Sequence, residues 1–445
     1  MMHNKKLPVA VIGGGPVGLA AAAHLAFRKI PFILFEAGQS VGQNFLSWQH
    51  VRVFSPWKYN IDKAAEELLS QTDWRAPDKE GLPTGGELVE KYFIPLSQHI
   101  SIAPHIQLNA KVLSVGRKGL DKMKTAGRED KPFSIKVNQG GTINYFEARA
   151  VIDATGTWNQ PNPIGSGGVY AEGELRFKDH IFYGIPNVKG DALDRYKNKN
   201  ILVVGGGHSA INALLDLADV QQEFPATQLH WVLRKNDISS VYGGKEEDAL
   251  EARGALGIRI EKLVNSGKLS VYTPFHILKL KEHNKSIQVE GDLHGTATLI
   301  PDIDEIISNT GSRPDLDMIR EVRIDLDASL ESVFDLAELI DPNIHSCGTV
   351  RPHGEKELRH PEKGFYIVGS KSYGRAPTFL MATGYEQVRS IVAYLDGDIE
   401  AAERVELDLP QTGVCSSNLN LESNGSACCG TEAVVERAEA STGCC

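Results

Sequence analysis

The chain has 445 residues, with 41% hydrophobic and 23% charged side chains, which is enough for two or three domains with packed cores. The formal net charge of -10 argues against nucleic acid or an anionic membrane as a partner. The apolar stretch 9–27 contains a glycine cluster and His24, so it fits a buried strand and helix better than a membrane or signal segment. We find no targeting signal and expect a cytoplasmic protein.

The first elements follow the pattern of a strand, a tight glycine turn and a helix. The apolar residues 9–12 precede a turn and an alanine-rich stretch formed from Gly13, Gly14, Gly15, Pro16 and Gly18 onward. The first glycine of this pattern makes the turn, the second lets the backbone approach a pyrophosphate, and the third lets the helix pack on the strand. Free N–H groups and the positive dipole end at the helix N-terminus favour phosphate. Glu36 ends the next predicted strand, where an acid accepts hydrogen bonds from an adenosine ribose.

The next elements lead to a crossing between two units. A helix is predicted over 84–94, after Pro83. Residues 117–132 are polar and charged and predict a hairpin or a surface loop, whereas 133–137 alternate like a half-exposed strand. Residues 148–153 predict a buried strand that ends in a turn at Thr155 and Gly156. The stretch 159–168 is rich in Pro and Gly, which is typical of a crossing between domains.

A second copy of the glycine pattern lies at 200–210. An apolar run leads into Gly205 and Gly207, and Ala210 takes the place of the third glycine. One such match is weak evidence. Two matches, each between a predicted strand and a predicted helix, indicate two dinucleotides and electron transfer between them.

Basic residues follow the second strand of this copy, 229–233. Arg234 and Lys235 stand where the first copy has Glu36. Cations there favour the 2′-phosphate of NADPH over NADH, although a solvated basic strand end would give the same pattern. His208 and Ser209 are candidates to contact the phosphates or to cap the helix.

The chain then returns to the first unit. Residues 302–308 predict a strand that is closed by Thr310 and Gly311, which repeats the earlier Thr-Gly turn. A strand at 365–368 is followed by Gly369, and a helix is expected from Pro377 or Thr378 to about 395. The composition beyond residue 406 predicts disorder. We therefore expect one domain from 1–165 and 335–405, a second from 166–334, and a flexible tail from 406–445.

This organisation resembles the two-domain flavoproteins. It is closest to the flavin-containing monooxygenases and to relatives encoded beside cation-efflux or arsenic-resistance genes, to which segments 50–62 and 82–88 are similar. The resemblance covers residues 8 to about 398. It implies an α/β fold with two Rossmann-like domains, the first discontinuous and binding FAD, the second binding NADPH.

The expected site residues follow from the glycine patterns and the resemblance. The residues expected to bind the two cofactors are Gly13, Gly14, Gly15, Pro16, Gly18, Glu36, Gln43, Trp48, Thr155, Gly156, Gly205, Gly207, His208, Ser209, Arg234, Lys235, Thr310, Gly311 and Gly369. Trp48 is equally a candidate for core packing. Asn60 and His180 are weak catalytic candidates. Asn60 suits a turn at least as well, and the spacing around His180 matches the linker signature of the monooxygenases only loosely.

The six cysteines are unevenly placed. The first 346 residues contain none, although the disulfide-reductase branch of these flavoproteins needs a redox cysteine pair near the flavin. The tail holds two adjacent pairs, Cys428 with Cys429 and Cys444 with Cys445, which do not suit a structural disulfide framework. Thiolates select thiophilic ions, so these four are candidate ligands for a metal or for trivalent arsenic. An accidental tail is the alternative.

Three functions fit these features. The first is an NADPH-dependent, FAD-containing monooxygenase that acts on a small molecule with a soft nitrogen, sulfur or carbonyl centre. The second is a metal or metalloid reductase in which the tail cysteines act as carrier. The third is a flavin-bearing binding or sensor protein for thiophilic ions. The substrate, the acid and base, and the oligomeric state stay open.

Overall fold

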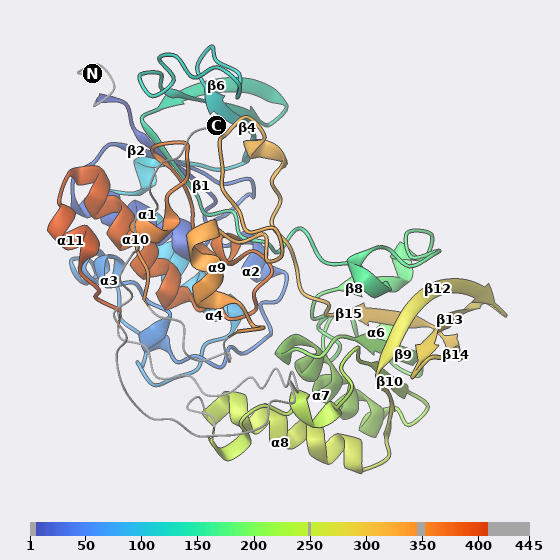
Figure 1. Cartoon of the computed structure of the whole chain (residues 1–445). Helices are drawn as coiled ribbons and strands as arrows, with labels where there is room; N and C mark the ends of the chain where they lie inside the picture. Colours follow the sequence, from blue (N-terminus) through green and yellow to red (C-terminus); the bar gives the residue numbers. More distant parts are fainter. Residues whose placement is uncertain (1–5, 248–250, 345–351, 408–445) are drawn as a thin grey trace, which may run out of the picture.

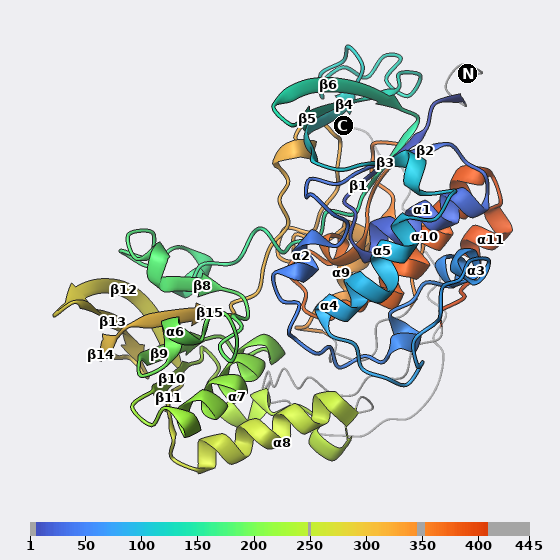
Figure 2. The same ribbon diagram turned by 180° about the vertical axis from the view of Figure 1, so that it is seen from behind.

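The computed structural model describes residues 6–247, 251–344 and 352–407. These residues form two α/β units, each built on a parallel five-stranded sheet (Figures 1 and 2). The first unit contains both ends of the described chain, and the second is formed by the middle of the chain. The predicted fold class, with two Rossmann-like units of which the first is discontinuous, is thereby confirmed.

The first sheet has the strand order β16-β7-β1-β2-β3. Its strands are β1 (Val9–Ile12), β2 (Phe32–Phe35), β3 (Ile106–Gln107), β7 (Ala150–Asp153) and β16 (Phe365–Ile367). Neighbouring strands are parallel throughout, and β1 lies between β2 and β7. All four residues of β1 are buried, as a central parallel strand with helices on its faces requires.

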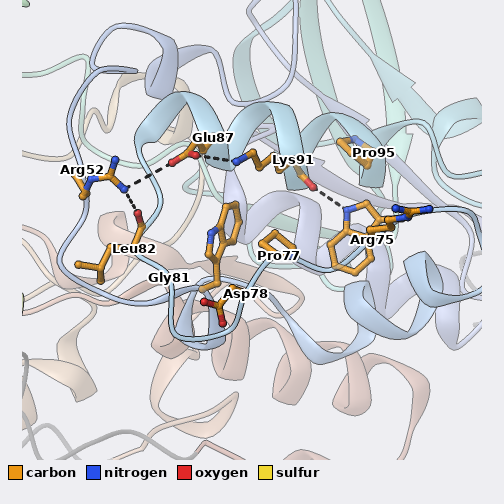
Figure 3. A pocket seen from close by; sticks show the side chains of 11 residues that line it. Arg52, Arg75, Pro77, Asp78, Gly81, Leu82, Glu87, Lys91 and Pro95 are labelled. Carbon is orange, nitrogen blue, oxygen red and sulfur yellow. Dashed lines mark hydrogen bonds and ion pairs between the residues drawn. The ribbon is translucent and has the colours of Figure 1, made fainter.

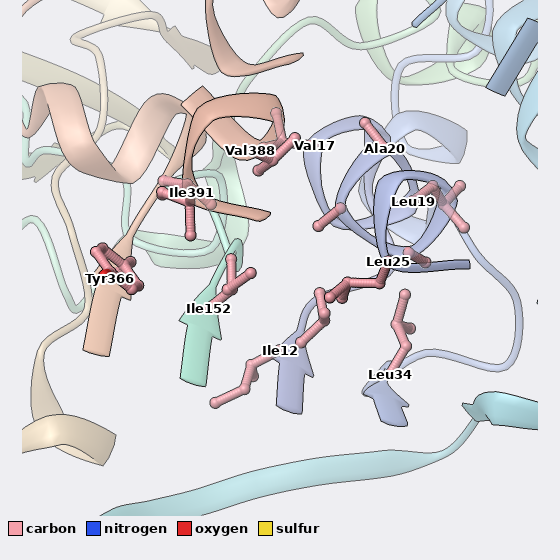
Figure 4. Close-up of a cluster of buried hydrophobic side chains, with 14 of the residues drawn as sticks. Ile12, Val17, Leu19, Ala20, Leu25, Leu34, Ile152, Tyr366, Val388 and Ile391 are labelled. Carbon is pink, nitrogen blue, oxygen red and sulfur yellow. The ribbon is translucent and has the colours of Figure 1, made fainter. Parts of the chain in front are cut away.

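Helices cover this sheet. They are α1 (Pro16–Phe27), α2 (Gln43–Leu46), α3 (Lys63–Ser70), α4 (Gly85–Leu88), α5 (Ile94–Ser97), α9 (Phe334–Ile340), α10 (Met381–Asp396) and α11 (Ile399–Glu403). The small residues 20–23 of α1 are fully buried and allow α1 to pack closely against α10 and α3. Figure 4 shows Leu19 and Leu25 of α1 and Ile391 of α10 over the strand residues Ile12 and Ile152.

The second sheet repeats this plan with the order β11-β10-β9-β15-β8. Its strands are β8 (Ile181–Tyr183), β9 (Asn200–Val204), β10 (Gln228–Val232), β11 (Leu269–Tyr272) and β15 (Glu305–Ser308). The helices of this unit are α6 (Leu193–Tyr196), α7 (His208–Glu223) and α8 (Glu251–Asn265). The glycine turn of each unit therefore follows the middle strand of its sheet.

In each unit, an antiparallel three-stranded sheet precedes one strand of the parallel sheet, namely β7 in the first unit and β15 in the second. These sheets are formed by β4 (Ala110–Arg117), β5 (Phe133–Gln139) and β6 (Thr142–Ala148), and by β12 (Phe275–His283), β13 (Ser286–Leu293) and β14 (Thr296–Ile303). The predicted strand 302–308 is confirmed only from Glu305, where β15 begins. Asp302 and Ile303 instead end β14, and Asp304 lies between the two strands.

Two helix predictions differ in detail from the structure. The expected helix at 84–94 begins with a capping box, in which Thr84 and Glu87 satisfy each other's backbone N–H groups. It then continues through a π-helical turn at Val89–Phe93 into α5. The later helix was expected from Pro377 or Thr378, but α10 begins at Met381 because Leu380 is still extended.

Candidate functional site

The first glycine turn lies at the carboxyl end of β1. Gly13 has φ of +103°, and a Cβ there would come within 2.7 Å of the Ala154 oxygen. A Cβ at Gly18 would lie 1.8 Å from the Gly13 oxygen, so only glycine allows the helix to approach the turn so closely. At Gly15, by contrast, a Cβ would meet no atom of the described residues within 4 Å. The N-terminus of α1, with Pro16 at its first position, is therefore open to a ligand.

Glu36 and the start of α2 flank this turn. The Glu36 carboxylate accepts the N–H of Gly14 and the N–H of Gly38, each at 2.6 Å. The Gly42 N–H donates to the Gly14 oxygen at 2.9 Å, which brings the exposed Gln43 beside the turn. The arrangement offers an acid for ribose hydroxyls next to N–H groups for a pyrophosphate, so it fits a dinucleotide.

The other expected residues of the first unit lie along the same edge of the sheet. Gly156 has φ of +68°, and a Cβ there would be 3.3 Å from the Ser370 hydroxyl, so the turns after β7 and β16 are adjacent. The N–H of Gly369 donates to the buried Gln387 side chain at 2.7 Å. A Cβ at Gly369 would lie 3.3 Å from the Val17 side chain on α1. The structure thus brings the three turns of the first unit together.

Trp48 lies close to the crossing that leaves the first unit. Its ring centroid is 4.5 Å from that of Phe45 and 6.2 Å from that of Trp158, which follows Gly156. A Cβ at Gly85 would be 2.7 Å from the Trp48 ring. Trp48 is half-buried, so it packs against the unit and also presents part of its ring at this edge.

The second glycine turn follows β9 and has the same geometry. A Cβ at Gly205, where φ is +129°, would be 2.2 Å from the Asn309 oxygen, and the Gly205 oxygen accepts the Trp231 indole N–H at 2.8 Å. A Cβ at Gly207 would meet no atom of the described residues within 4 Å. Ala210 is fully buried against the core of the unit. The N-terminus of α7 is therefore a second open phosphate-binding end.

The basic residues after β10 are exposed beside this turn. Neither Arg234 nor Lys235 has an ion-pair partner within the described ranges, and the Lys235 ammonium reaches only the Ser240 oxygen at 3.4 Å. Ser209 is exposed, whereas His208 is half-buried with its ring centroid 5.5 Å from that of Phe54. Phe54 belongs to the first unit, so the two units touch at the N-terminus of α7.

Thr310 and Gly311 lie where the chain crosses back to the first unit. They are hydrogen-bonded to Asn162, which lies where the chain leaves that unit. The Thr310 hydroxyl donates to the Asn162 oxygen at 2.6 Å, and the Asn162 side chain donates back to the Thr310 oxygen at 3.1 Å. The Asn162 N–H donates to the Gly311 oxygen at 2.9 Å. These two residues therefore join the two crossings. They also lie near the second glycine turn, because the preceding residue, Asn309, contacts Gly205.

The family model described as pyridine nucleotide-disulphide oxidoreductase matches residues 10–339, which is most of the chain. The protein belongs to this family. The two open glycine turns agree with it, and the expected enzyme class, an oxidoreductase that uses FAD and NADPH, is confirmed.

Similar proteins carry several different names. The curated ferredoxin--NADP reductase 2 of Exiguobacterium sibiricum is 23% identical over 85% of this chain and 91% of its own length. The ferredoxin--NADP reductase of Lactococcus lactis is 24% identical over 93% and 99% of the two chains. Bacillithiol disulfide reductase of Bacillus cereus has a TM-score of 0.66 at 17% identity, covering 88% and 99%. The cadaverine monooxygenase DfoA of Erwinia amylovora has a TM-score of 0.62 at 12% identity, covering 93% and 99%. These structural likenesses show the fold.

The two catalytic candidates do not lie at the open turns of this oxidoreductase. Asn60 is buried, and its side-chain amide donates to the Ser55 and Pro56 oxygens at 2.7 and 3.0 Å while its oxygen accepts the Ser55 hydroxyl. Its amide therefore closes a turn. His180 is exposed and precedes β8, at the amino edge of the second sheet, whereas the glycine turn lies at the carboxyl edge. Its Nδ1 is 3.1 Å from the Asp304 oxygen.

The four cysteines that we expect to bind a metal lie outside the described residues, and so do the other two cysteines of the chain. Within the described ranges, no three His, Cys, Asp or Glu side chains are grouped to hold a metal ion. No helix in that part of the chain has the length and apolarity needed to cross a bilayer.

Sequence reasoning missed a buried ion pair at the edge of the first sheet. Lys371 and Asp153 lie between the turns after β16 and β7, and both are fully buried. The sequence around Lys371 carries no signal of this burial, because a lysine that follows a strand is ordinarily exposed.

Proposed function

We propose that this protein is an NADPH-dependent FAD monooxygenase that acts on a small molecule with a soft nitrogen, sulfur or carbonyl centre. One observation carries the assignment of the two cofactors. Both glycine turns are open at a helix N-terminus, yet the strand beside the first is followed by Glu36 and the strand beside the second is followed, after one residue, by Arg234 and Lys235. The acid suits an unsubstituted ribose and the cations suit a 2′-phosphate.

In the first unit, FAD would lie along the carboxyl edge of the sheet. The N-terminus of α1 would hold its pyrophosphate. Glu36 would release the Gly14 N–H and bind the ribose instead. Gly369, which faces Val17 of α1, would lie beside the same cofactor. Bound FAD supplies the capacity to accept a hydride from a nicotinamide and to pass electrons on.

In the second unit, NADPH would bind at the N-terminus of α7. The expected boundary at 334 is too late for this unit, because Ile319, Val322 and Val333 are buried in the core of the first unit. Gly207 leaves room for the pyrophosphate of NADPH, and Arg234 and Lys235 would pair with its 2′-phosphate. The contact between Phe54 and His208 supports this arrangement, because it sets the first unit against the end of α7 that would hold the nicotinamide nucleotide. Trp48 and Trp158 would help to exclude water near the crossing.

The electron acceptor follows from the cysteine distribution. No cysteine occurs in residues 1–346, so this part of the chain has no dithiol to receive electrons from the flavin. We therefore propose an acceptor that lies outside this part of the chain. With oxygen as the acceptor, the two electrons of NADPH and two protons leave one oxygen atom in the substrate and the other in water. The occurrence of the same fold in DfoA, named as a monooxygenase, is compatible with this reaction.

The test begins with the purified protein. We expect bound yellow flavin, NADPH oxidation that exceeds NADH oxidation, and oxygen consumption that rises with amine, thioether or ketone substrates. Labelled oxygen should appear in the product by mass spectrometry. Colourless protein that FAD cannot reconstitute would contradict the flavin assignment. Bound flavin with substrate turnover that proceeds equally well without oxygen would contradict only the monooxygenase assignment.

A second candidate is a flavin-dependent reductase of a thiophilic metal or metalloid. Five of the six cysteines lie between residues 415 and 445, which favours a carrier role for Cys428, Cys429, Cys444 and Cys445. The resemblance to flavoproteins encoded beside arsenic-resistance genes supports the same candidate. Removal of residues 408–445 separates the two proposals. The reductase loses NADPH oxidation with arsenate or Cu(II), whereas the monooxygenase keeps its oxygen-dependent turnover.

A further inference from the structure

A pocket of about 510 Å³ opens in the first unit, beside the helical stretch that carries Glu87, Lys91 and Pro95 (Figure 3). Three segments line it, namely 52–57, 74–82 and 87–95. None of the residues expected to bind FAD or NADPH contributes to its wall. Its volume falls in the range of sites for small organic ligands, which is roughly 300 to 1,000 Å³. The pocket is therefore a candidate for a ligand other than the two cofactors.

Hydrogen bonds between its three segments hold the pocket open in a fixed shape. The Val53 N–H donates to the Pro83 oxygen at 2.9 Å, and the Trp57 N–H donates to the Gly81 oxygen at 3.0 Å. The Trp74 indole N–H donates to the Lys91 oxygen at 2.8 Å. A preformed wall of this kind spares a ligand the entropy cost of ordering loops on binding.

The charges on the wall leave a surplus of cations. Arg52 and Lys91 both flank Glu87, with nitrogen-to-oxygen distances of 3.9 and 2.8 Å, and Glu87 also accepts the Thr84 N–H. The hydrogen bond from Lys91 is the main reason why the pKa of Glu87 is lowered. Arg75 has no ion-pair partner among the described residues, and Figure 3 places it at the opposite end from Arg52. Asp78 is the other acid, and one of its oxygens accepts the Glu80 N–H at 3.2 Å.

The rest of the wall is apolar and partly aromatic. Trp57, Trp74, Pro77, Leu82 and Pro95 supply these surfaces. Aromatic and proline side chains bind flat apolar groups well, since they bury area at little entropy cost. Arginine guanidinium groups bind carboxylates through paired, parallel hydrogen bonds. We propose that this pocket binds a small organic carboxylate with a flat apolar body, at a site separate from FAD and NADPH.

The experiment measures binding to the full-length flavin-loaded protein by calorimetry and tryptophan fluorescence. The probes are phenylacetate and indole-3-acetate, compared with neutral phenylacetamide and cationic phenethylamine. We expect at least one acid to bind about tenfold more tightly than the amide and the amine, the size of one charge-assisted contact. Arg75→Gln should weaken that binding about tenfold, because Arg75 has no acidic partner among the described residues, whereas Arg52→Gln at the opposite end should weaken it less. Saturating NADPH should leave it unchanged.

Arg176→Gln is the matched control, because Arg176 is a surface arginine of the second unit with a 69% exposed side chain. It should bind the acids like the original protein, and melting curves should show that all three variants fold. Failure of both acids to bind, equal binding of acid and amide, or binding that neither pocket variant weakens would overturn the proposal. Displacement by NADPH would also overturn it, because the acids would then occupy the nucleotide site. None of these outcomes depends on whether the enzyme uses oxygen.

Discussion

The Lys371 ammonium lies 2.7 Å from Oδ2 of Asp153, and the two side chains are 1% and 0% exposed. Asp153 is the last residue of β7, and Lys371 lies in the short helical turn Gly369–Tyr373 that follows β16. The Thr155 hydroxyl donates to the other Asp153 oxygen at 2.7 Å and accepts from Lys371 at 3.2 Å. The pair therefore fixes the two turns against which we place FAD.

Replacing this lysine should strongly destabilise the first unit. Lys371→Met leaves the Asp153 carboxylate buried without a countercharge, which costs about 3–5 kcal/mol. Urea unfolding of the flavin-free protein measures this loss. The double variant Asp153→Asn with Lys371→Met should recover about 2 kcal/mol or more, because no buried charge is left.

Lys363→Met is the control for the loss of an ion pair as such. Lys363 pairs with Glu129 at 2.9 Å, but its side chain is 73% exposed. This variant should lose less than about 1 kcal/mol. Equal losses for Lys371→Met and Lys363→Met would show that the buried pair does not support the turns.

Replacing Gly15 and Gly207 by alanine should weaken the binding of FAD and of NADPH, respectively. Gly15→Ala adds a methyl group that meets no atom of the described residues but occupies the approach to α1, so FAD should bind at least about tenfold more weakly. Gly207→Ala should raise the KM for NADPH about tenfold and leave the flavin content unchanged. Folding should change by less than about 1 kcal/mol in both, since each residue is an N-cap with an ordinary negative φ.

Flavin fluorescence during dilution and steady-state kinetics measure these two effects. Each variant is the control for the other, because the same change is made in equivalent turns. Gly18→Ala tests the structural role of the pattern and should lower the melting temperature itself, since its Cβ would clash with the Gly13 oxygen. If Gly15→Ala and Gly207→Ala affect both cofactors alike, the assignment of one cofactor to each turn is wrong.

The exposed arginine after β10 should set the preference between the two nicotinamide nucleotides. Arg234→Gln removes a cation that we place beside the 2′-phosphate, so the KM for NADPH should rise about tenfold, as expected for one lost charge-assisted contact. The KM for NADH, which has no 2′-phosphate, should change little. Arg176→Gln serves as the control for a surface charge of the same unit. A parallel rise in both KM values would place Arg234 elsewhere on the nucleotide or in the fold.

His360 should contribute to a loss of stability in mild acid. Burial lowers the pKa of His360 from its ordinary 6.5 to about 4. Its Nδ1 accepts the Asp325 N–H at 3.2 Å, which requires a ring without a proton on that atom. Between pH 6.5 and 4 the unfolded chain binds a proton that the folded protein refuses, so stability falls as the pH decreases through this window. The loss approaches about 3 kcal/mol.

His360→Asn keeps a hydrogen-bond acceptor and removes the titration, so it should flatten the dependence of unfolding free energy on pH between 6.5 and 4. The control is His294→Asn, since His294 is exposed and asparagine tolerates its left-handed backbone, with φ of 54°. Identical slopes for the original protein and His360→Asn would show that this histidine is not the group responsible.

The two glycine turns could be predicted because their signals are local. A buried strand, a cluster of glycines and an alanine-rich helix follow one another within a few residues, and Gly13 and Gly205 both need positive φ. The start of the strand at 302–308 was misplaced for a related reason. No glycine separates the end of β14 from the start of β15, so the sequence does not mark the break at Asp304.

The pair of Lys371 with Asp153 could not be predicted, because 218 residues separate the two in the chain. Only the parallel pairing of β16 with β7 brings them together, and that pairing is a property of the whole sheet. The pocket at 52–95 was missed because its cations belong to three segments that meet only after the loops fold. Asn60 could be predicted as a turn residue, since an amide is commonly used to close turns.

The bonds from Asn162 to Thr310 and Gly311 place the beginning and the end of the second unit side by side. Residues 163–309 therefore form an insertion in the first unit, because the two ends of this segment lie side by side. Segments whose ends meet in this way can be inserted, exchanged or removed as one piece with little change to the host. The flavin scaffold could thus have acquired, and could exchange, its electron-donating module in a single genetic event.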